Sequence, residues 1–447
     1  MSYNETTGSL TTYGEDVGPY VAISHVWADG LGSNTEKGLP TCQIKRIHKY
    51  VCQLLPGGTP AFWIDGLCIP EERELRKMAI RKMGDTYKRA LKVLVFDESI
   101  RTLCSPNNPP EENVFRISMC PWMQRVWTLQ EALLAEELYF EFAEEIIVPA
   151  HALRGAMMEE RYDQYGFPTF KTIVVERLPI WGILGPRQQT YGFEEIVSLL
   201  VHRMTSKPSD EPLAIAGLLN VDTKKLDVDG KTDLESRLQA LFLEIETFSA
   251  ELLWTIYPRM EQSPGFRWAP ASLTFVGELS RKNVPSVMAN RYVFHGDAVC
   301  SSRGITTERV VPVLYFTDVH IAGDRHDPSL DSIFLHDSPR GALYQMDNVP
   351  CRHATVRTFN GIVFGSPSHL GVMPEGTRVP TVAVNILDCE RLGPVLEEGE
   401  DVEEAREGLP PIVCEFVQHV DVSHRQIMLS STRALRCRLI MSRVTFR

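Results

Sequence analysis

The sequence is poor in cysteine and has no long apolar run. Its 447 residues include ten cysteines, and no two of them form a C-x-x-C pair. That spacing argues against zinc ribbons and thioredoxin-like redox sites, and so few cysteines in a chain of this length do not make a disulfide framework. Apolar runs such as 213–219 are far shorter than the ~18 residues that a membrane helix needs. We therefore expect no membrane span.

Targeting signals are also missing from the sequence. Residues 1–16 are polar and slightly acidic. They show neither the apolar stretch of a secretory signal nor the Arg-rich amphipathic pattern of a transit peptide. Together with cysteines that we expect to be reduced, this indicates a cytoplasmic protein.

The sequence has fewer basic than acidic residues. Lys and Arg number 46 against 58 Asp and Glu, which gives a formal net charge of −12. A chain this acidic has no general electrostatic footprint for a phosphate backbone, so we expect no nucleic-acid partner. At 43% hydrophobic residues the composition is that of a globular protein, and the length suggests two or three domains.

Nucleotide-binding and catalytic fingerprints are incomplete. The loop Asp29-Gly30-Leu31-Gly32-Ser33 has Thr35 where the dinucleotide fingerprint needs glycine, and it lacks the Gly-Lys-Ser/Thr of a P-loop. A flexible strand-to-helix turn fits it better, and such a turn can still border a ligand. Ser24-His25 lies in no G-x-S-x-G elbow, and neighbours on a strand point to opposite faces. We therefore expect no catalytic Ser–His pair there, and no spacing matches a metal-ligand template, so no metal is expected.

Strands and helices alternate over residues 20–150. Strands are predicted at 20–26, 61–65, 92–96 and 138–142, and helices at 42–55, 71–90 and 121–137. This alternation predicts an α/β fold with a mostly parallel sheet, whose ligands bind beyond the carboxyl ends of the strands. Those ends carry Ser24 to Asp29, Asp65 to Cys68, and Asp97.

The rest of the chain shows other sequence patterns. Residues 1–19 form an N-terminal extension. Residues 151–255 carry helical spacing, at 193–204, 211–219 and 232–248. Residues 256–447 hold short β-rich runs separated by turn residues, which predicts a β-rich C-terminal portion.

The expected helix 121–137 carries the most informative carboxylate. Trp127 and Glu131 are four residues apart and therefore share a face. Apolar side chains on several sides predict that the helix is buried. Desolvation would then raise the pKa of Glu131 and suit it to acid/base or cation-stabilising work. The alternative is a structural carboxylate paired with an arginine, for instance Arg125, and the residues alone leave both open.

Four ordered blocks resemble the fungal HET (heterokaryon-incompatibility) domain. They are YVAISHVWADG at 20–30, FWIDGLCIP at 62–70, KMGDTYKRALKVLVFD at 82–97 and WMQRVWTLQEALLA at 122–135. A weaker match continues at 203–219. The resemblance implies a role in fungal allorecognition and programmed cell death. HET domains are in turn distantly similar to TIR domains, which implies a TIR/flavodoxin-like domain over 20–150.

Some TIR domains hydrolyse NAD by means of a glutamate four residues after a tryptophan, and Glu131 follows Trp127 at that spacing. The resemblance thus implies NAD or a related nucleotide as the substrate, Glu131 as the catalytic residue, and no cofactor. The expected substrate-binding residues are Ser24, Trp27, Asp29, Asp65, Arg125 and Trp127. Among these, the serine and aspartates would bond ribose hydroxyls, the arginine would face a phosphate, and a tryptophan would stack on a base.

Two other functions stay open. The same residues could hold together a non-enzymatic signalling module that acts through self-association or an allorecognition partner. Alternatively, the chain could be a structural or regulatory protein whose HET domain has lost its output. Release of nicotinamide from NAD by the pure protein would separate the enzyme from both.

Overall fold

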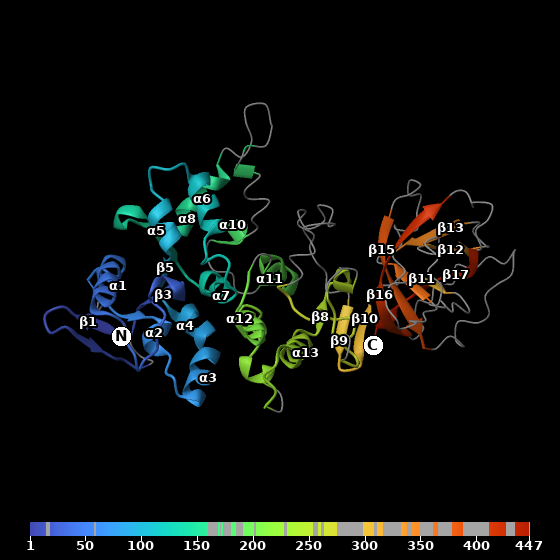
Figure 1. Cartoon of the computed structure of the whole chain (residues 1–447), viewed down its shortest axis with the longest axis horizontal. Coiled ribbons are helices and arrows are strands. Elements are labelled where there is room, and N and C mark those ends of the chain that lie inside the picture. The colour runs from blue at the N-terminus through green and yellow to red at the C-terminus, as the bar shows by residue number, and fades with distance from the viewer. Residues whose placement is uncertain are drawn as a thin grey trace. The chain divides into compact units, whose positions relative to one another are not determined.

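A five-stranded sheet organises the N-terminal part of the computed structural model (Figure 1). Its order is β4-β3-β5-β6-β7, with strands at Val21–His25 (β3), Phe62–Trp63 (β4), Lys92–Phe96 (β5), Leu138–Glu141 (β6) and Ile147–Pro149 (β7). The first four strands run parallel and β7 is antiparallel to β6. The predicted parallel α/β sheet is confirmed. A small hairpin precedes it, Ser2–Asn4 (β1) with Ser9–Thr11 (β2).

The structure describes most of the N-terminal half and parts of the remainder. Described residues are 1–14, 18–57, 60–159, 169, 171–172, 180–184, 191–200, 203–227, 230–253, 258–260, 263–274, 298–307, 311–315, 332–337, 342–347, 361–364, 378–387, 411–425 and 434–446. A bilayer-spanning helix is absent from these residues.

Helices connect the strands of the sheet. They are Thr41–Leu54 (α1), Asp65–Cys68 (α2), Arg73–Arg81 (α3), Met83–Arg89 (α4), Glu98–Leu103 (α5), Pro110–Met119 (α6), Trp127–Leu133 (α7) and Ala150–Met158 (α8). Local chemistry fixes several ends. The Asp97 carboxylate caps α5 by accepting from the backbone N–H groups of Ser99 and Ile100.

Two predicted helices are shorter than their apolar spacing suggested. The helix predicted at 71–90 is broken at Lys82 into α3 and α4. The helix predicted at 121–137 is regular only over 127–133, because backbone groups before it bond to distant partners. The N–H of Trp122 donates to Asp97 and that of Val126 to the carbonyl of Met204.

Helices continue beyond the sheet, as predicted. They are Ile180–Ile183 (α10), Phe193–Leu200 (α11), Glu211–Ala216 (α12) and Leu234–Ile245 (α13). Short 3₁₀ turns lie at Trp27–Asp29, Ala143–Glu145, Pro208–Asp210, Thr223–Leu226 and Ala250–Leu253.

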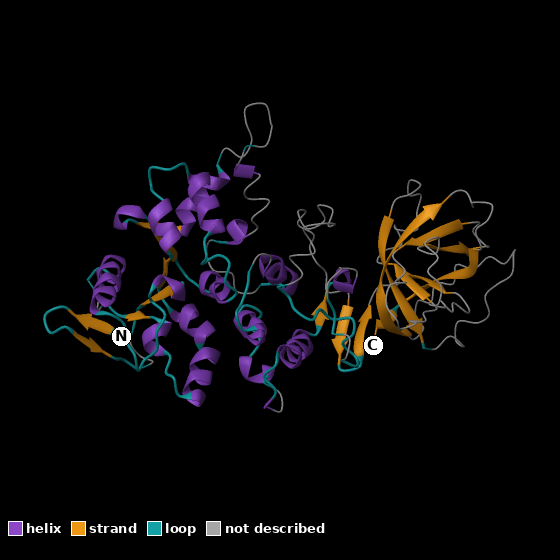
Figure 2. Ribbon diagram, in the orientation of Figure 1, coloured by secondary structure: helices purple, strands orange, loops and turns teal. Residues whose placement is uncertain are grey.

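The C-terminal portion is built from strands, as predicted (Figure 2). They are Thr247–Phe248 (β8), Ala298–Ser301 (β9), Gly304–Thr307 (β10), Val311–Tyr315 (β11), Ser332–Asp337 (β12), Ala342–Asp347 (β13), Gly361–Phe364 (β14), Arg378–Ile386 (β15), Ile412–Arg425 (β16), Ala434–Ser442 (β17) and Val444–Phe446 (β18). Most neighbouring pairs are antiparallel. The β12–β17 and β16–β18 pairs are parallel.

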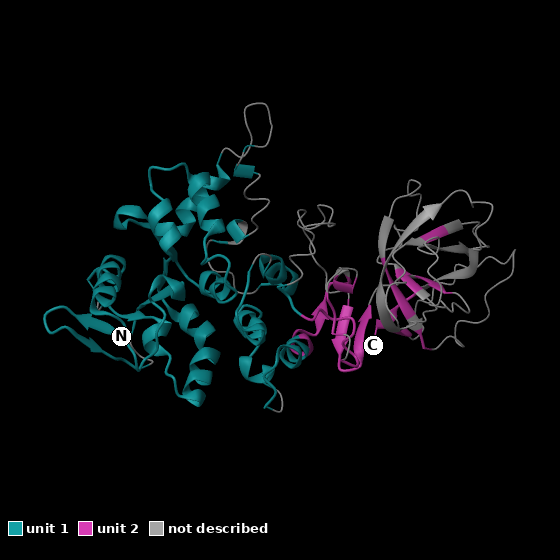
Figure 3. Ribbon diagram, viewed as in Figure 1, with its two compact units in different colours: residues 1–241, 272–292 teal, residues 242–271, 293–447 magenta. Residues whose placement is uncertain are grey.

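The chain divides into two compact units, coloured separately in Figure 3. One comprises residues 1–241 and 272–292, and the other 242–271 and 293–447. The three-part division expected at 150/151 and 255/256 is finer than these units, and its boundaries stay predictions.

One face of the five-stranded sheet packs on α1. Val21 and Ile23 of β3 contact a cluster that includes Ile47 and Val51 of α1. Because side chains alternate along a strand, Ser24 lies on the opposite face from these residues. Because of that alternation, the Ser24 side chain faces away from α1 and can contact α7.

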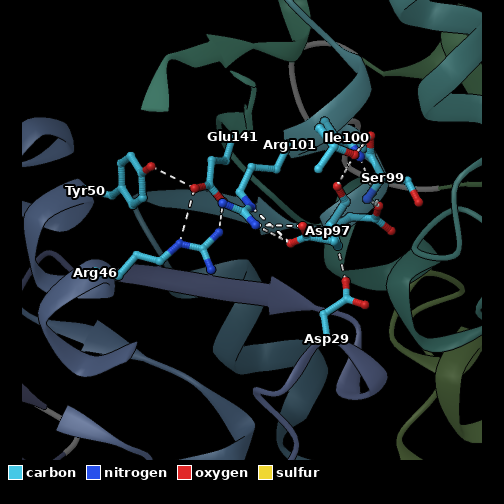
Figure 4. Close-up of polar contacts among 10 residues, drawn as sticks. Asp29, Arg46, Tyr50, Asp97, Ser99, Ile100, Arg101 and Glu141 are labelled. Atoms are coloured by element: carbon cyan, nitrogen blue, oxygen red, sulfur yellow. Dashed lines mark hydrogen bonds and ion pairs between the residues drawn. The ribbon is translucent and has the colours of Figure 1, made fainter. Parts of the chain in front are cut away.

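An ion pair between a half-buried arginine and a buried glutamate ties α1 to the sheet. Arg46 donates to both carboxylate oxygens of Glu141, which is 1% exposed, and lies 4.7 Å from the centre of the Phe96 ring. The Tyr50 hydroxyl donates to the same carboxylate at 2.7 Å (Figure 4). Burial, together with this bond to Glu141, raises the pKa of Tyr50.

Removing the arginine should therefore destabilise the fold. Arg46→Met keeps the apolar stem but leaves a buried carboxylate without its cation, which should lower the free energy of unfolding by about 3 kcal/mol. Urea unfolding measures this loss. The matched control is Lys49→Met, which breaks the exposed Lys49–Glu145 pair on the same helix. Equal stability of the two variants would contradict the assigned role.

Candidate functional site

The buried carboxylate of Glu131, on α7, contacts the end of β3. Ser24 Oγ donates to Glu131 Oε2, and Trp122 Nε1 donates to Ser24 Oγ at 2.6 Å. Ser24 and Trp122 are fully buried, and Glu131 is 7% exposed. Sequence reasoning expected Ser24 and Glu131 in one site, and the structure joins them directly.

The surroundings of Glu131 disfavour its charged form. Burial raises the pKa of this carboxyl, and the Ser24 hydrogen bond and the nearby Arg125 charge only partly oppose it. The Tyr87 hydroxyl lies close by. Its pKa is also raised, by burial and then by the Glu131 charge. Such a carboxylate resembles the perturbed groups found in active sites.

Arg125 is beside Glu131 without forming an ion pair to it among the described residues. Its Nη1 donates instead to the main-chain oxygen of His25, at 2.7 Å. The structural alternative, a Glu131–Arg125 pair, therefore has no geometric support. Arg125 still acts on Glu131 through its charge.

Asp65 begins α2, directly after β4, and lies beside the end of β3. Its Oδ1 is 2.5 Å from His25 Nε2, and its Oδ2 accepts from Trp27 Nε1 at 2.7 Å. The Gly66 N–H donates to Oδ1 as well. Burial would raise the pKa of Asp65, but the His25 charge and these hydrogen bonds outweigh it, so the pKa is lowered.

These contacts define what Asp65 and Trp27 can do. Three donors already satisfy most of the Asp65 acceptor capacity. The carboxylate is therefore placed to orient its neighbours more than to bind ribose hydroxyls. Trp27 is anchored by its N–H yet 42% exposed. Its ring is thus a fixed and accessible aromatic face.

Two expected site residues form hydrogen bonds to other partners. The Asp29 carboxylate accepts from the N–H of Glu98, at the first residue of α5 and next to the capping Asp97 (Figure 4). The Trp127 indole donates to Asp210 at 3.4 Å, away from Ser24, although it shares a helix with Glu131. Neither residue contacts the Ser24–Glu131 pair through a hydrogen bond in the described part of the chain.

Arg203 is a site-supporting residue that sequence reasoning missed. It is 3% exposed, and its Nη1 donates to the carbonyl of Arg125 at 2.7 Å and to Thr128 Oγ1 at 3.0 Å. Burial lowers its pKa to about 10. The segment around Arg203 thus holds the start of α7. Its resemblance to a recurring HET-associated segment was the available signal.

Further contacts from the same region fix α7. The N–H of Met204 donates to the carbonyl of Gln124 at 2.6 Å, and the Tyr191 hydroxyl donates to the carbonyl of Leu133 at 3.0 Å. At Gly84 an added Cβ would lie 3.3 Å from Gln130 Oε1 and 3.8 Å from the Gly217 Cα. The helix that carries Glu131 is therefore positioned partly by residues 191–217.

The site offers no metal-ligand set within the described ranges, where no group of three His, Cys, Asp or Glu side chains could hold an ion. The donors at the end of β3 are instead a carboxylate, a hydroxyl, an imidazole and indole N–H groups. These groups suit a polar organic ligand.

Part of the chain is similar to heterokaryon incompatibility proteins. Residues 20–102 match the family model described as heterokaryon incompatibility protein (HET). The chain is also 21% identical over 229 residues to the vegetative incompatibility protein HET-E-1 of Podospora anserina. That match covers 49% of this chain and 16% of the relative's length. No solved structure matches the chain.

The buried carboxylate makes a prediction about stability and pH. Because the folded-state pKa of Glu131 is raised, the folded state binds this proton more tightly than the unfolded state does. The stability that follows is fully present below the unfolded value of about 4.3 and is lost as pH rises through the folded pKa. Glu131→Gln removes this loss and keeps an acceptor for Ser24. Its Tm should therefore match the wild type near pH 4 and exceed it by a few degrees at pH 7.

The matched control is the exposed Glu136→Gln, which should follow the wild type at every pH. A large drop in the Tm of Glu131→Gln at pH 7 would instead mean that the charge of Glu131 holds the fold together.

Proposed function

We propose that the chain, whose residues 20–102 match the heterokaryon incompatibility (HET) family model, acts in fungal heterokaryon incompatibility and the associated cell death. We propose further that it does so by hydrolysing the nicotinamide–ribose bond of NAD or of a related nucleotide, with Glu131 as the catalytic residue. The observation that carries this is a carboxylate, buried and bonded to Ser24, at the carboxyl edge of a parallel sheet.

The topology supports a TIR/flavodoxin-like reading of the domain. Numbered along the chain, the four parallel strands follow the order 2-1-3-4, which is that of flavodoxin-like sheets. In such sheets a ligand binds outside the carboxyl ends, where the strand order reverses. Here the reversal lies at β3, whose last two residues are Ser24 and His25. The site therefore lies where flavodoxin-like sheets bind their ligands, and this supports the proposal of a nucleotide.

The proposed cleavage needs a negative charge near the ribose. As the C1′–N bond breaks, its electron pair goes to the nicotinamide nitrogen, and positive charge develops on the ribose. An ionised Glu131 can stabilise this charge better than water, because it is fixed and desolvated. Its raised pKa means that activity should fall on the acid side at a higher pH than an ordinary glutamate would give.

The neighbouring groups have matching roles. Trp27 offers an exposed ring on which a base can stack. Arg125 uses one donor on the His25 carbonyl, and its positive charge suits a phosphate. Trp122 holds the Ser24 hydroxyl so that its proton points to Glu131. We assign Asp29 and Trp127 no direct part, since their contacts lie elsewhere.

A second function, signalling without catalysis, has one observation in its favour. Leu75 and Met78 on α3 are both about half exposed, at 49% and 51%. Exposed apolar side chains on one helix suit self-association or an allorecognition partner. This function predicts that the charge of Glu131 can be removed without loss of cell death.

Release of nicotinamide distinguishes the two functions. The purified full chain should convert NAD to ADP-ribose and nicotinamide, and Glu131→Gln should lose about 10²–10³ of the rate while keeping a wild-type fold. Glu136→Gln, exposed and three residues from the end of α7, should keep the activity. A folded Glu131→Gln protein with wild-type turnover would contradict the catalytic role. A wild-type protein that releases no nicotinamide while still causing cell death would favour the signalling function.

A further inference from the structure

We propose that His25 is the general base of this site, accepting through Nδ1 the proton of the water that attacks the ribose, with Asp65 as its positioning residue. This inference rests on the proposed hydrolysis and adds a residue to it. Glu131, occupied in stabilising the ribose cation, does not by itself account for the proton that water must lose. Glycoside hydrolysis uses a separate group for that step in inverting enzymes.

The imidazole of His25 is buried, and only one of its two ring nitrogens has a hydrogen-bond partner among the described residues. Its side chain is 2% exposed, and Nε2 is 2.5 Å from Asp65 Oδ1. Nδ1 has no hydrogen-bond partner within the described residues and is shielded from solvent. Buried polar atoms nearly always have a partner, so an unpaired nitrogen next to a candidate site points to a group that arrives with the ligand.

The tautomer follows from the hydrogen-bond network. Asp65 already accepts from Trp27 and Gly66, and these hydrogen bonds, together with that of His25, favour its ionised form. An ionised carboxylate only accepts, so Nε2 must carry a hydrogen. In the neutral imidazole, which is the form that can act as a base, Nδ1 then presents its lone pair. An aspartate that fixes a histidine tautomer in this way leaves the other ring nitrogen free to act as a base.

The position of His25 complements that of Glu131. Ser24 and His25 are consecutive on β3, and their side chains bond to different elements, α7 and α2. The two acid/base groups therefore approach the end of β3 from opposite sides. The charged groups that act around them are Asp65, Arg125, Arg203 and Glu131 itself. A water on the face of the ribose opposite the leaving group would meet the His25 side.

The proposed second step balances in atoms and charge. Water oxygen bonds to C1′ of the ribose cation, and one water proton passes to His25 Nδ1. The products are ADP-ribose and neutral nicotinamide, and the proton leaves to solvent from the imidazolium. Cleavage of the C1′–N bond does not need His25. The reverse reaction, in which free nicotinamide recombines with the cation, does not need it either.

That separation defines the experiment. The protein is incubated with NAD and labelled nicotinamide, and two rates are measured. The rate of exchange is the rate at which label enters NAD, and the rate of hydrolysis is the rate at which ADP-ribose forms. His25→Gln should lose about 10²–10³ of its hydrolysis and keep exchange within a few-fold of the wild type. Asp65→Asn should change in the same direction by less. Glu131→Gln should lose both reactions.

His48→Gln is the matched control. His48 lies on α1, is also buried, and also has an unpartnered Nδ1 among the described residues, but it is next to Cys52 and Glu5 and not to Asp65. It should retain both rates. If a buried histidine is required only for folding, the two histidine variants should fail alike, with matching losses of Tm.

Each result decides the proposal. Wild-type hydrolysis by His25→Gln, or equal loss of both reactions in a folded His25→Gln protein, overturns the assignment while leaving the role of Glu131 intact. A wild-type chain that neither hydrolyses nor exchanges overturns the proposed function itself. If His25→Gln does not fold, Asp65→Asn decides: unchanged hydrolysis contradicts the proposal, and selective loss of hydrolysis supports it.

Discussion

The rest of the site depends on a carboxylate that is kept in the protein interior and has no ion-pair partner among the described residues. Glu131 is bonded to Ser24, which Trp122 holds in turn. A buried Glu–Arg pair would have neutralised the charge and removed its chemical use. Instead Arg125 is turned to a backbone carbonyl, and burial is left to raise the pKa of Glu131. This arrangement costs stability, which natural proteins accept mainly at functional sites.

The helix that carries this carboxylate is too short to position itself. Seven residues make fewer than two complete turns, and isolated helices of that length are unstable in water. Its position comes from outside, through Arg203 and Met204 at its start and Tyr191 at its end. The residues after the matched HET segment are thus part of what places Glu131.

The parts of the fold that depend on local pattern were predictable. Strands with continuous apolar runs were predicted within one or two residues, and the positions of Ser24 and Asp65 at the strand ends followed from topology. The start of α7 was not predictable, because Trp122 and Val126 exchange helical hydrogen bonds for partners 25 and 78 residues away. The hydrogen bond of Trp127 was likewise not predictable from local pattern: its helix face was predicted, but its indole bonds to Asp210, which is distant in sequence. His25 was considered only as half of a Ser–His pair, which the missing G-x-S-x-G elbow and the alternation of side chains along a strand argued against. Its contact with Asp65, 40 residues away, was not considered.

The protonation of Glu131 itself is the quantity on which the account depends most. A difference infrared titration, wild type minus Glu131→Gln, isolates the carboxyl stretching band of this one residue. The account predicts that the band disappears at a pH above the ordinary glutamate value of about 4.3, since burial outweighs the Ser24 bond and the Arg125 charge. A transition at or below that value would show a carboxylate stabilised by its neighbours, and would contradict the central claim.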